Sequence, residues 1–468
     1  MPEKSFCIHG HFYQPPRVDP RTKAIPQEPG AQPFSNWTER IYHECYFPNA
    51  QKENYKRISF NFGPTLTAWL EENHNETLTE IIRQENSVFN TYGVSKAMAQ
   101  PYFHAILPLL PHRERETLVR WGIDEFSTRY GHPPKGMWLP ETAVDLDSLE
   151  VLADNNIQFT ILAPWQAKDS ELDITQPYRI LLPNDKEMIV FFYNSFLSSE
   201  ISFNTSATMQ ADTFASNWLK PQYEALQRDQ DQLLLAASDG ELYGHHMAER
   251  EKFLEYLLDQ AIQKDSFKVT FPALWLQSHP QIDITEINEN TSWSCHHGIE
   301  RWRDVCGDAP NATWKAPLRR FLDQLGKSLD TMYLEFTQEY IQDPWKLRDA
   351  YIDLILGKCT GKELVQGYAI KKLGDDVLKQ VLMMLDSQFE RLRMHSSDAW
   401  FFFDFDSIEP LNGLKYAAHA VWLARSVTGK DVSAPLLSDL ALASSDETGL
   451  SGDAAFLKIL NSYSLSDK

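Results

Sequence analysis

The sequence has 468 residues, of which 65 are acidic and 44 basic, so the formal net charge is −21. A protein that binds nucleic acid or an anionic membrane surface needs a basic face, and the acidic excess argues against both partners. Hydrophobic residues make up 43% of the chain and charged residues 23%, which is typical of a globular protein and excludes a disordered one.

Three further features bear on the cellular setting. The first residues, MPEKSFCIHGH, lack the basic segment and long apolar segment of a secretory signal. No stretch reaches the roughly 20 apolar residues that a membrane-spanning helix needs. The five cysteines are odd in number and form no C-x-x-C pair. We therefore expect a cytoplasmic protein with buried free thiols, while its oligomeric state stays open.

The first 285 residues alternate short apolar runs with amphipathic stretches. The apolar runs predict strands at 6–13, 58–64, 159–164, 189–194, 233–239 and 271–278. The amphipathic stretches predict helices at 78–89, 115–131, 145–156 and 249–264. Strands that alternate with helices indicate a parallel α/β fold, and nearly all-apolar strands indicate a sheet covered on both faces.

The pattern changes at about residue 286. A polar, loop-like stretch comes first, and long helical patterns follow at 317–341, 345–358, 375–394 and 413–427. We therefore predict an α/β catalytic domain over residues 1–285 and a mostly helical domain over residues 286–468, packed on the first.

The first predicted strand leads into the sequence HGHFYQPPR. Because side chains alternate along a strand, His9 and His11 should point to the same face. Two histidines on one face can be metal ligands, hydrogen-bond partners of a polar ligand, or satisfied core groups.

A carboxylate follows the apolar residues of the stretch PPKGMWLPETAVD. Glu141 at this position can be a charge near the N-terminus of a helix, where the helix dipole favours it. The preceding Pro140 and the nearby Trp138 would instead hold the carboxylate in one place, which favours a catalytic role.

The stretch SDGELYGHH follows the continuously apolar residues 233–237. It could supply Asp239, Glu241, His245 and His246 to zinc or manganese, with His9 and His11 completing the set, but the spacing matches no helix-registered ligand pattern. Alternatively, Asp239 pairs with a second carboxylate at the end of another strand. Glycoside hydrolysis requires such a pair, with carboxyl groups about 5–5.5 Å apart when the anomeric configuration is retained.

Taken together, these three stretches resemble glycoside hydrolase family 57, which acts on α-glucans. The resemblance implies that Glu141, in WLPE, is the nucleophile and that Asp239, in DGELYGH, is the general acid/base. It also implies a distorted (β/α)7 barrel followed by helices. One departure is that Phe12 and Tyr13 separate His11 from Gln14, whereas in many members a histidine directly precedes Gln-Pro.

The later part of the chain resembles a bacterial subgroup of the family with a C-terminal domain of unknown function. The stretches that carry this resemblance are FSNWTERIYHECYFPNA, ISFNFGPTLTAWLE, WSCHHGIERWRDVCG and WFFFDFDSIEP. The expected activity is that of a retaining glycoside hydrolase or 4-α-glucanotransferase-like enzyme. It would act on an oligosaccharide or polysaccharide without a metal or another cofactor.

The remaining expectations concern side chains around the two carboxylates. The charge of Glu241, together with partial burial, should raise the pKa of Asp239 so that it can act as an acid. Polar side chains should bind sugar hydroxyls, namely His9, His11, Gln14, Glu241 and His246. Aromatic side chains should stack on sugar rings, namely Trp37, Trp138, Trp165 and Trp293. In the second domain, Trp302, Trp400 and Asp404 either close one side of the sugar groove or serve domain packing.

Two alternatives remain from the residues alone. The chain could be a catalytically silent carbohydrate-binding protein on the same scaffold. It could also be a metal-dependent polysaccharide deacetylase that uses His9, His11 and Asp239.

Overall fold

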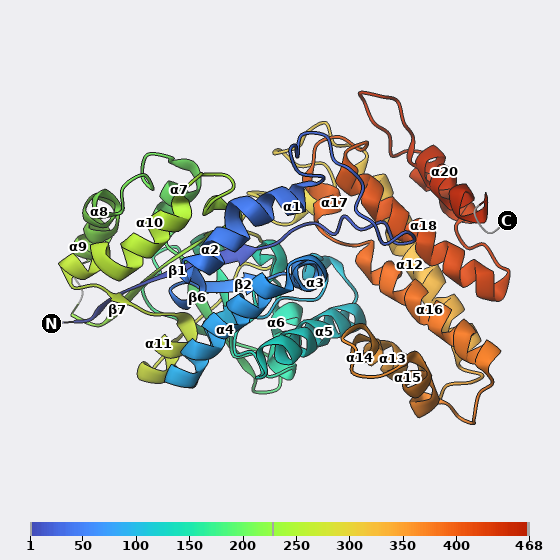
Figure 1. Cartoon of the computed structure of the whole chain (residues 1–468), viewed down its shortest axis with the longest axis horizontal. Coiled ribbons are helices and arrows are strands. Elements are labelled where there is room, and N and C mark those ends of the chain that lie inside the picture. The colour runs from blue at the N-terminus through green and yellow to red at the C-terminus, as the bar shows by residue number, and fades with distance from the viewer. Residues whose placement is uncertain (1, 227–228, 466–468) are drawn as a thin grey trace. The chain divides into compact units, whose positions relative to one another are not determined.

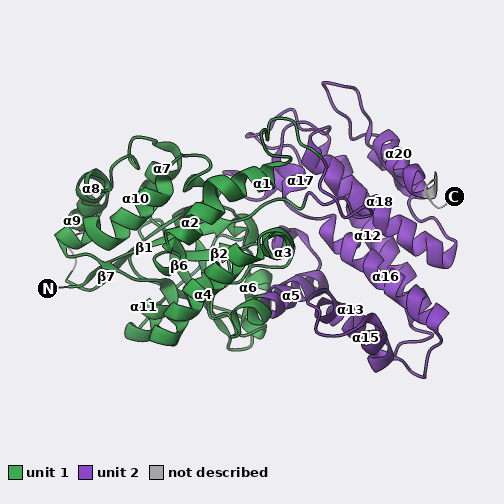
Figure 2. Cartoon of the chain, in the orientation of Figure 1, with its two compact units in different colours: residues 1–16, 27–102, 126–294 green, residues 17–26, 103–125, 295–468 purple. Residues whose placement is uncertain are grey.

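The computed structural model describes residues 2–226 and 229–465 and divides into two compact units (Figure 2). Unit 1 contains residues 1–16, 27–102 and 126–294, and unit 2 contains residues 17–26, 103–125 and 295–468. The chain passes from unit 1 to unit 2 for the last time after residue 294, close to the predicted boundary at residue 285. The sequence did not indicate that segments 17–26 and 103–125 belong with the helical part.

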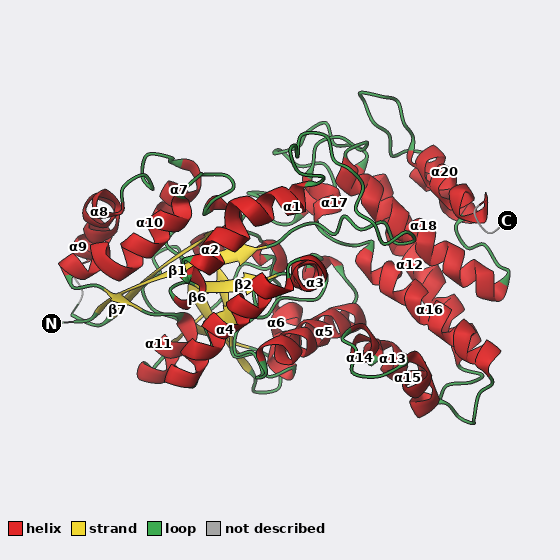
Figure 3. Cartoon of the chain, viewed as in Figure 1, coloured by secondary structure: helices red, strands yellow, loops and turns green. Residues whose placement is uncertain are grey.

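All of the described strands lie in unit 1 (Figure 3). They are β1 (Lys4–Phe12), β2 (Ser59–Phe62), β3 (Ala97–Met98), β4 (Phe159–Leu162), β5 (Tyr178–Leu181), β6 (Glu187–Phe192), β7 (Gln232–Asp239), β8 (Lys268–Val269) and β9 (Asp283–Thr285). Five of the six predicted strands are confirmed as β1, β2, β4, β6 and β7. Strands β3, β5, β8 and β9 have two to four residues and carry too little apolar pattern to be predicted.

The strands form two sheets. One has the order β3-β2-β1-β7, with β8 also paired to β1, and the other has the order β4-β6-β5-β9. All pairings are parallel except that of β5 with β6. Single bridges from Met137 to Ala99 and from Gly136 to Phe159 connect β3 to β4. No sheet closes within the described residues, so the α/β fold is confirmed but a closed seven-stranded barrel is not.

Both sheets face a common hydrophobic core. Alternate residues of β7 point into it (Leu233, Leu235 and Ala237), as do Phe159 and Ile161 of β4. This spacing of two follows from the alternation of side chains along a strand. Strands β1 and β7 (Figure 1) are also buried along nearly all of their length, as expected for parallel strands covered on both faces.

The described α-helices of unit 1 begin and end as follows: α1 (Trp37–Ile41), α2 (Phe47–Gln51), α3 (Pro64–Asn73), α4 (Asn75–Tyr92), α6 (Leu146–Asp154), α7 (Ser195–Phe203), α8 (Ala211–Phe214), α9 (Lys220–Leu226), α10 (Arg250–Tyr256) and α11 (Pro272–Ser278). Helix α6 packs against β6, and α7 packs against β7. The strand predicted at 271–278 is wrong, because this segment forms α11. Pro272 starts the helix with its fixed φ, and a short apolar run does not distinguish a strand from a buried helix.

Unit 2 is helical. Helix α5 (His112–Tyr130) begins in segment 103–125, and the helices after residue 295 are α12 (Lys315–Thr337), α13 (Pro344–Asp349), α14 (Tyr351–Ile355), α15 (Gly361–Tyr368), α16 (Asp375–Arg393), α17 (Asp398–Phe401), α18 (Ile408–Thr428), α19 (Leu437–Leu440) and α20 (Gly452–Leu465). The long helical patterns are confirmed as α12, α13 with α14, α16 and α18. In the described part of the chain, no helix is both long and apolar enough to cross a bilayer.

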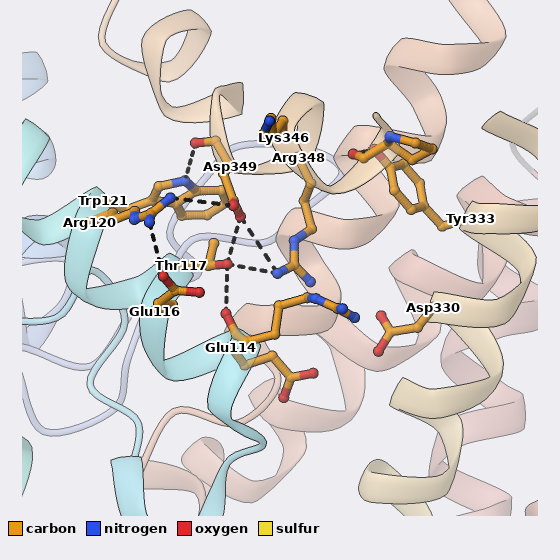
Figure 4. Close-up of polar contacts among 12 residues, drawn as sticks. Glu114, Glu116, Thr117, Arg120, Trp121, Asp330, Tyr333, Lys346, Arg348 and Asp349 are labelled. Carbon is orange, nitrogen blue, oxygen red and sulfur yellow. Dashed lines mark hydrogen bonds and ion pairs between the residues drawn. The ribbon is translucent and has the colours of Figure 1, made fainter. Parts of the chain in front are cut away.

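A buried polar network connects the helices of unit 2. Figure 4 shows Thr117 of α5 between two residues of α13: Arg348 donates to the Thr117 hydroxyl at 2.7 Å, and that hydroxyl donates to Asp349 at 2.7 Å. Arg391 of α16 donates to Glu114 of α5 at 2.5 Å and to Asp330 of α12 at 2.8 Å. Buried charges are tolerated when they are paired in this way.

Replacing Arg391 with methionine should lower the free energy of unfolding by about 3–5 kcal/mol, because the buried Glu114 would lose its cation. Chemical denaturation monitored by circular dichroism measures the change. The matched control is Arg425→Met, since Arg425 is half exposed and pairs with Asp431 at 3.5 Å. The control should change stability by no more than about 1 kcal/mol. Equal losses in the two variants would contradict a stabilising role for the buried network.

Candidate active site

Asp239 lies at the carboxyl end of β7. Residues 232–238 of the strand are buried, and Asp239 is its last residue and the one with exposed surface, although the surrounding protein desolvates its carboxyl group. In the parallel pairing of β1 with β7, Asp239 is the partner of His11, and Asn61 of β2 is the partner of His11 on the other side. These three polar side chains therefore lie where neighbouring parallel strands end, which is the usual edge for an active site in such folds.

The surroundings of Asp239 favour its protonated form. Desolvation of its carboxyl by the surrounding protein is the larger cause, and the negative charge of Glu141 adds to it, so that the pKa rises from 3.8 to about 7. The sequence analysis attributed the raised pKa to partial burial and to the charge of Glu241. Burial is confirmed as the larger cause, but the charge that adds to it is that of Glu141.

Glu141 has an unusual backbone conformation. Its φ is 56°, and that of Thr142 is 50°, both in the left-handed region that non-glycine residues seldom adopt. Such conformations occur often at functional sites. The alternative role as a helix N-terminal charge is wrong, because α6 begins at Leu146 and Asp145 caps it by accepting from the Ser148 N–H.

Two side chains from a distant part of the sequence hold the Glu141 carboxylate. The Oε2 atom accepts a hydrogen bond from Trp293 Nε1 at 3.0 Å and one from Ser294 Oγ at 2.6 Å. The Trp293 backbone N–H also donates to the Glu141 carbonyl at 3.1 Å. Trp293 was predicted as a stacking platform, whereas Ser294 was missed because nothing in its local sequence marks it.

Replacing Ser294 with alanine should lower kcat/KM for a glucan substrate roughly 10- to 100-fold, since a hydrogen bond to a charged group contributes about 1.5–3 kcal/mol. The loss should appear in kcat, because the hydroxyl positions Glu141 and is not assigned a sugar contact. Ser294→Thr is the control, because it keeps the hydroxyl and should restore most of the activity. Unchanged steady-state kinetics in Ser294→Ala would contradict this positioning role.

Trp138 forms the centre of an aromatic group beside the carboxylates. It stacks on His9 with a centroid distance of 4.8 Å and on His11 at 5.1 Å, and Trp293 meets it edge-on at 5.0 Å. Trp138 is fully buried, so its ring has no face on which a sugar could stack, contrary to the prediction. It packs against the two histidines instead.

The two histidines are neutral. Burial lowers the pKa of His9 to about 3 and that of His11 to about 4. His9 has no exposed surface, and its ring nitrogens contact Ser59 at 2.9 Å and Asn61 at 3.1 Å. In this conformation His9 therefore cannot contact a sugar hydroxyl directly, contrary to the prediction. His11, in contrast, lies next to Asp239.

Glu241 lies two residues after Asp239, in the short turn that follows β7. It is buried and accepts a hydrogen bond from Tyr46 Oη at 2.7 Å and one from the Tyr13 backbone N–H at 3.2 Å. Burial raises its pKa to about 8, with a further contribution from Asp239. At neutral pH it is therefore mostly uncharged and supports Tyr13 and Tyr46, two residues that the sequence analysis did not assign to the site.

The other predicted residues of unit 1 differ in exposure. Gln14 is buried and hydrogen bonds to Tyr46. Trp37 is half-buried with an edge contact to His245, and His246 is exposed. Trp165 has an exposed fraction of 43%, while its indole nitrogen is fixed by the Ser292 carbonyl at 2.9 Å. Of the four predicted platforms, Trp165 has the largest exposed ring, because Trp37 and Trp293 are half-buried and Trp138 is buried.

The predicted contribution of unit 2 to sugar binding needs correction at two positions. Trp302 and Trp400 are fully buried within unit 2, so their indoles belong to its core and have no face for a sugar. Asp404 lies in a turn of unit 2, where its side chain accepts from the Asp406 backbone N–H at 3.2 Å.

The deacetylase alternative requires His9, His11 and Asp239 to hold a metal. In residues 2–226 and 229–465, these three side chains form no group with ligand atoms gathered around one point. Both ring nitrogens of His9 are also engaged by neighbouring side chains. The arrangement of these three side chains therefore does not support the metal site that a deacetylase would need.

Comparisons with known proteins agree with the α/β fold. The family described as Glycosyl hydrolase family 57 matches residues 12–288, and the family described as Domain of unknown function (DUF3536) matches residues 311–464. A segment of 137 residues is 24% identical to Alpha-amylase 1 of Dictyoglomus thermophilum, which is 28% of this chain and only 19% of that amylase.

Solved structures resemble the chain over nearly its whole length. An exo-type maltose-forming amylase from Pyrococcus sp. ST04 matches with a TM-score of 0.74 and 13% identity, over 93% of this chain and 82% of the amylase. A family 57 branching enzyme from Thermococcus kodakaraensis, solved with glucose, matches with a TM-score of 0.62 and 13% identity, over 99% of this chain and 94% of the enzyme. At such low identity, these likenesses show the fold alone.

Proposed function

The chain belongs to glycosyl hydrolase family 57, and we propose that it cleaves α-linked glucans with retention of anomeric configuration, through an intermediate on Glu141. The observation that carries the proposal is the carboxylate pair. Glu141 is fixed by two hydrogen bonds, and it helps to raise the pKa of Asp239 to about 7. Glu141 is therefore positioned as the hydrogen-bonded nucleophile. Asp239, with its raised pKa, is the proton donor.

In the first step, the Glu141 carboxylate attacks the anomeric carbon of the bound sugar. The bond from that carbon to the glycosidic oxygen breaks, and Asp239 gives its proton to the departing oxygen. Trp293 and Ser294 donate to Glu141 Oε2 and hold the carboxylate in position for this attack. The product of this step is a covalent glycosyl ester on Glu141.

In the second step, Asp239 is a carboxylate and takes a proton from the incoming acceptor. The acceptor oxygen attacks the anomeric carbon, and the ester bond to Glu141 breaks. Water as acceptor gives hydrolysis, and a sugar hydroxyl gives transfer. Because the configuration inverts twice, the product has the α-configuration of the substrate.

The choice of an α-glucan rests on the family and on the chemistry around the carboxylates. The similar proteins include amylases and a branching enzyme. The exposed ring of Trp165 offers an apolar surface on which a pyranose can stack. His11, next to Asp239, would bind a sugar hydroxyl through its neutral imidazole.

We also propose that unit 1 is an incomplete barrel. The two sheets share one core, and bridges at Gly136 and Met137 connect β3 to β4. This arrangement supports an incomplete (β/α)7 barrel in which the carboxyl ends of the strands carry the candidate site.

The test is a panel of soluble starch, amylose and defined maltooligosaccharides, with products resolved by mass and by proton NMR of the anomeric signals. The expected first product is the α-anomer, and oligosaccharides longer than the substrate would reveal transfer. The control is Glu141→Gln/Asp239→Asn, which should be inactive. An initial β-anomer would contradict the retaining mechanism, and no reaction with any α-glucan would contradict the substrate class.

A further inference from the structure

Four potential metal ligands meet at a place in unit 2 that the catalytic proposal does not use. They are Cys295, His297, Cys306 and Asp308, and their ligand atoms all lie within 4.8 Å of one another. We call them the cysteine–histidine cluster. Within the described residues, no other group of three or more such side chains gathers in this way.

Two tight turns supply the four side chains. In the first, the Gly298 N–H donates to the Cys295 carbonyl at 3.2 Å, and Gly298 has a φ of 82° that suits glycine. In the second, the Ala309 N–H donates to the Cys306 carbonyl at 2.9 Å. Each turn presents a sulfur from its first residue and a nitrogen or oxygen ligand from its third, so the cluster is built from C-x-H and C-x-D.

The backbone near the cluster leaves room for the His297 imidazole. A Cβ atom added at Gly307 would lie 2.6 Å from His297 Nε2, so any side chain at this position would displace the imidazole. The backbone N–H groups of His297 and Arg301 also donate to the Cys295 sulfur. Hydrogen bonds of this kind orient a thiolate for a metal ion.

The charges around the cluster fit a dication. Two thiolates, one carboxylate and a neutral imidazole around a divalent ion leave a net charge of −1. Arg301 lies 3.4 Å from Asp308, and the buried Lys315 donates to the Arg301 carbonyl at 3.1 Å and has electrostatic interactions with both cysteines. These two cations would more than offset the single negative charge of the complex.

We propose that the cysteine–histidine cluster binds one zinc ion in four-coordinate, structural form. Zinc prefers sulfur and imidazole ligands in a tetrahedral arrangement, and a fully ligated site of this kind stabilises the fold instead of performing catalysis. Binding would displace the thiol protons of Cys295 and Cys306 into solvent, with no change of oxidation state. The proposal is independent of the carboxylate pair.

Metal analysis of the full-length protein, purified without chelator after growth with added zinc, tests the site. One zinc ion per chain is expected by mass spectrometry of the elements, and cobalt substitution should give a thiolate-to-metal charge-transfer band. Cys295→Ser, Cys306→Ser and His297→Ala should each lose most of the bound zinc. The matched controls, His296→Ala and Cys359→Ser, remove the neighbouring histidine and a cysteine outside the cluster, and they should keep it.

A labelling experiment on the wild type keeps the proposal testable if a variant fails to fold. Iodoacetamide should leave Cys295 and Cys306 unmodified in the zinc-loaded protein and modify both after a strong chelator. Cys359, half-buried and outside the cluster, should react equally in both conditions. Protein without zinc and without the cobalt band would overturn the proposal. So would a disulfide between Cys295 and Cys306, or a Cys295→Ser variant that retains as much zinc as His296→Ala.

Discussion

Replacing Glu141 with glutamine should lower kcat/KM for an α-glucan by a factor on the order of 10⁴–10⁶, as for the loss of other enzymatic nucleophiles. The amide has nearly the same shape, and it can still accept hydrogen bonds from Trp293 and Ser294. It cannot form the glycosyl ester, so the covalent route is lost. Reducing-sugar release over long incubations measures the residual rate.

The matched control for this substitution is Glu289→Gln. Glu289 is an exposed carboxylate of the same unit that accepts from the Leu146 backbone N–H at 2.9 Å. Its replacement should leave kcat/KM within about twofold of wild type, since surface substitutions usually change little. Turnover of Glu141→Gln at a rate close to that of the control would remove Glu141 from the nucleophile role.

Asp239→Asn should lower kcat/KM about 10²–10⁴-fold, the range that a general acid/base contributes. With α-glucosyl fluoride the formation of the intermediate should be affected much less, because fluoride departs without a proton. Added azide should then restore turnover and give the α-glucosyl azide, since it attacks the intermediate on Glu141. In Glu141→Ala, azide should instead attack the substrate directly and give the β-glucosyl azide.

The pH dependence of the wild type checks the same role. The raised pKa keeps Asp239 protonated up to about pH 7, so kcat/KM should fall above that pH as the acid is lost. The alkaline limb should disappear in Asp239→Asn. A wild-type profile that stays flat to pH 9, or azide products with the opposite configurations, would contradict the assignment of roles.

The fold was predictable where the chain carries long patterns. The apolar runs that became β1 and β7, and the three- and four-residue spacing of buried leucines in α12, identify their elements without further context. The segment at 271–278 was predicted as a strand because burial on all sides removes the periodicity that separates a strand from a helix. The inclusion of segments 17–26 and 103–125 in unit 2 depends on long-range packing that no local pattern encodes.

The candidate site was predictable to a similar degree. Glu141 and Asp239 each stand in a short distinctive motif, but Ser294 reaches Glu141 from 153 residues away without any motif of its own. For Trp302 and Trp400 the sequence left sugar binding and domain packing open, because an indole in a polar stretch does not reveal its burial. The cysteine–histidine cluster was missed because its ligands come as C-x-H and C-x-D turns and not as a C-x-x-C pair.

The most direct test of the account is to trap the intermediate. A fluorinated α-glucosyl fluoride has a good leaving group, and its ring fluorine slows the second step, so a glycosyl-enzyme that forms should accumulate. Mass spectrometry of the intact protein and of its proteolytic peptides then locates the added sugar. The account predicts one glucosyl residue per chain, bound as an ester to Glu141. An adduct on another residue, or complete turnover to products of inverted configuration without an adduct, would contradict it.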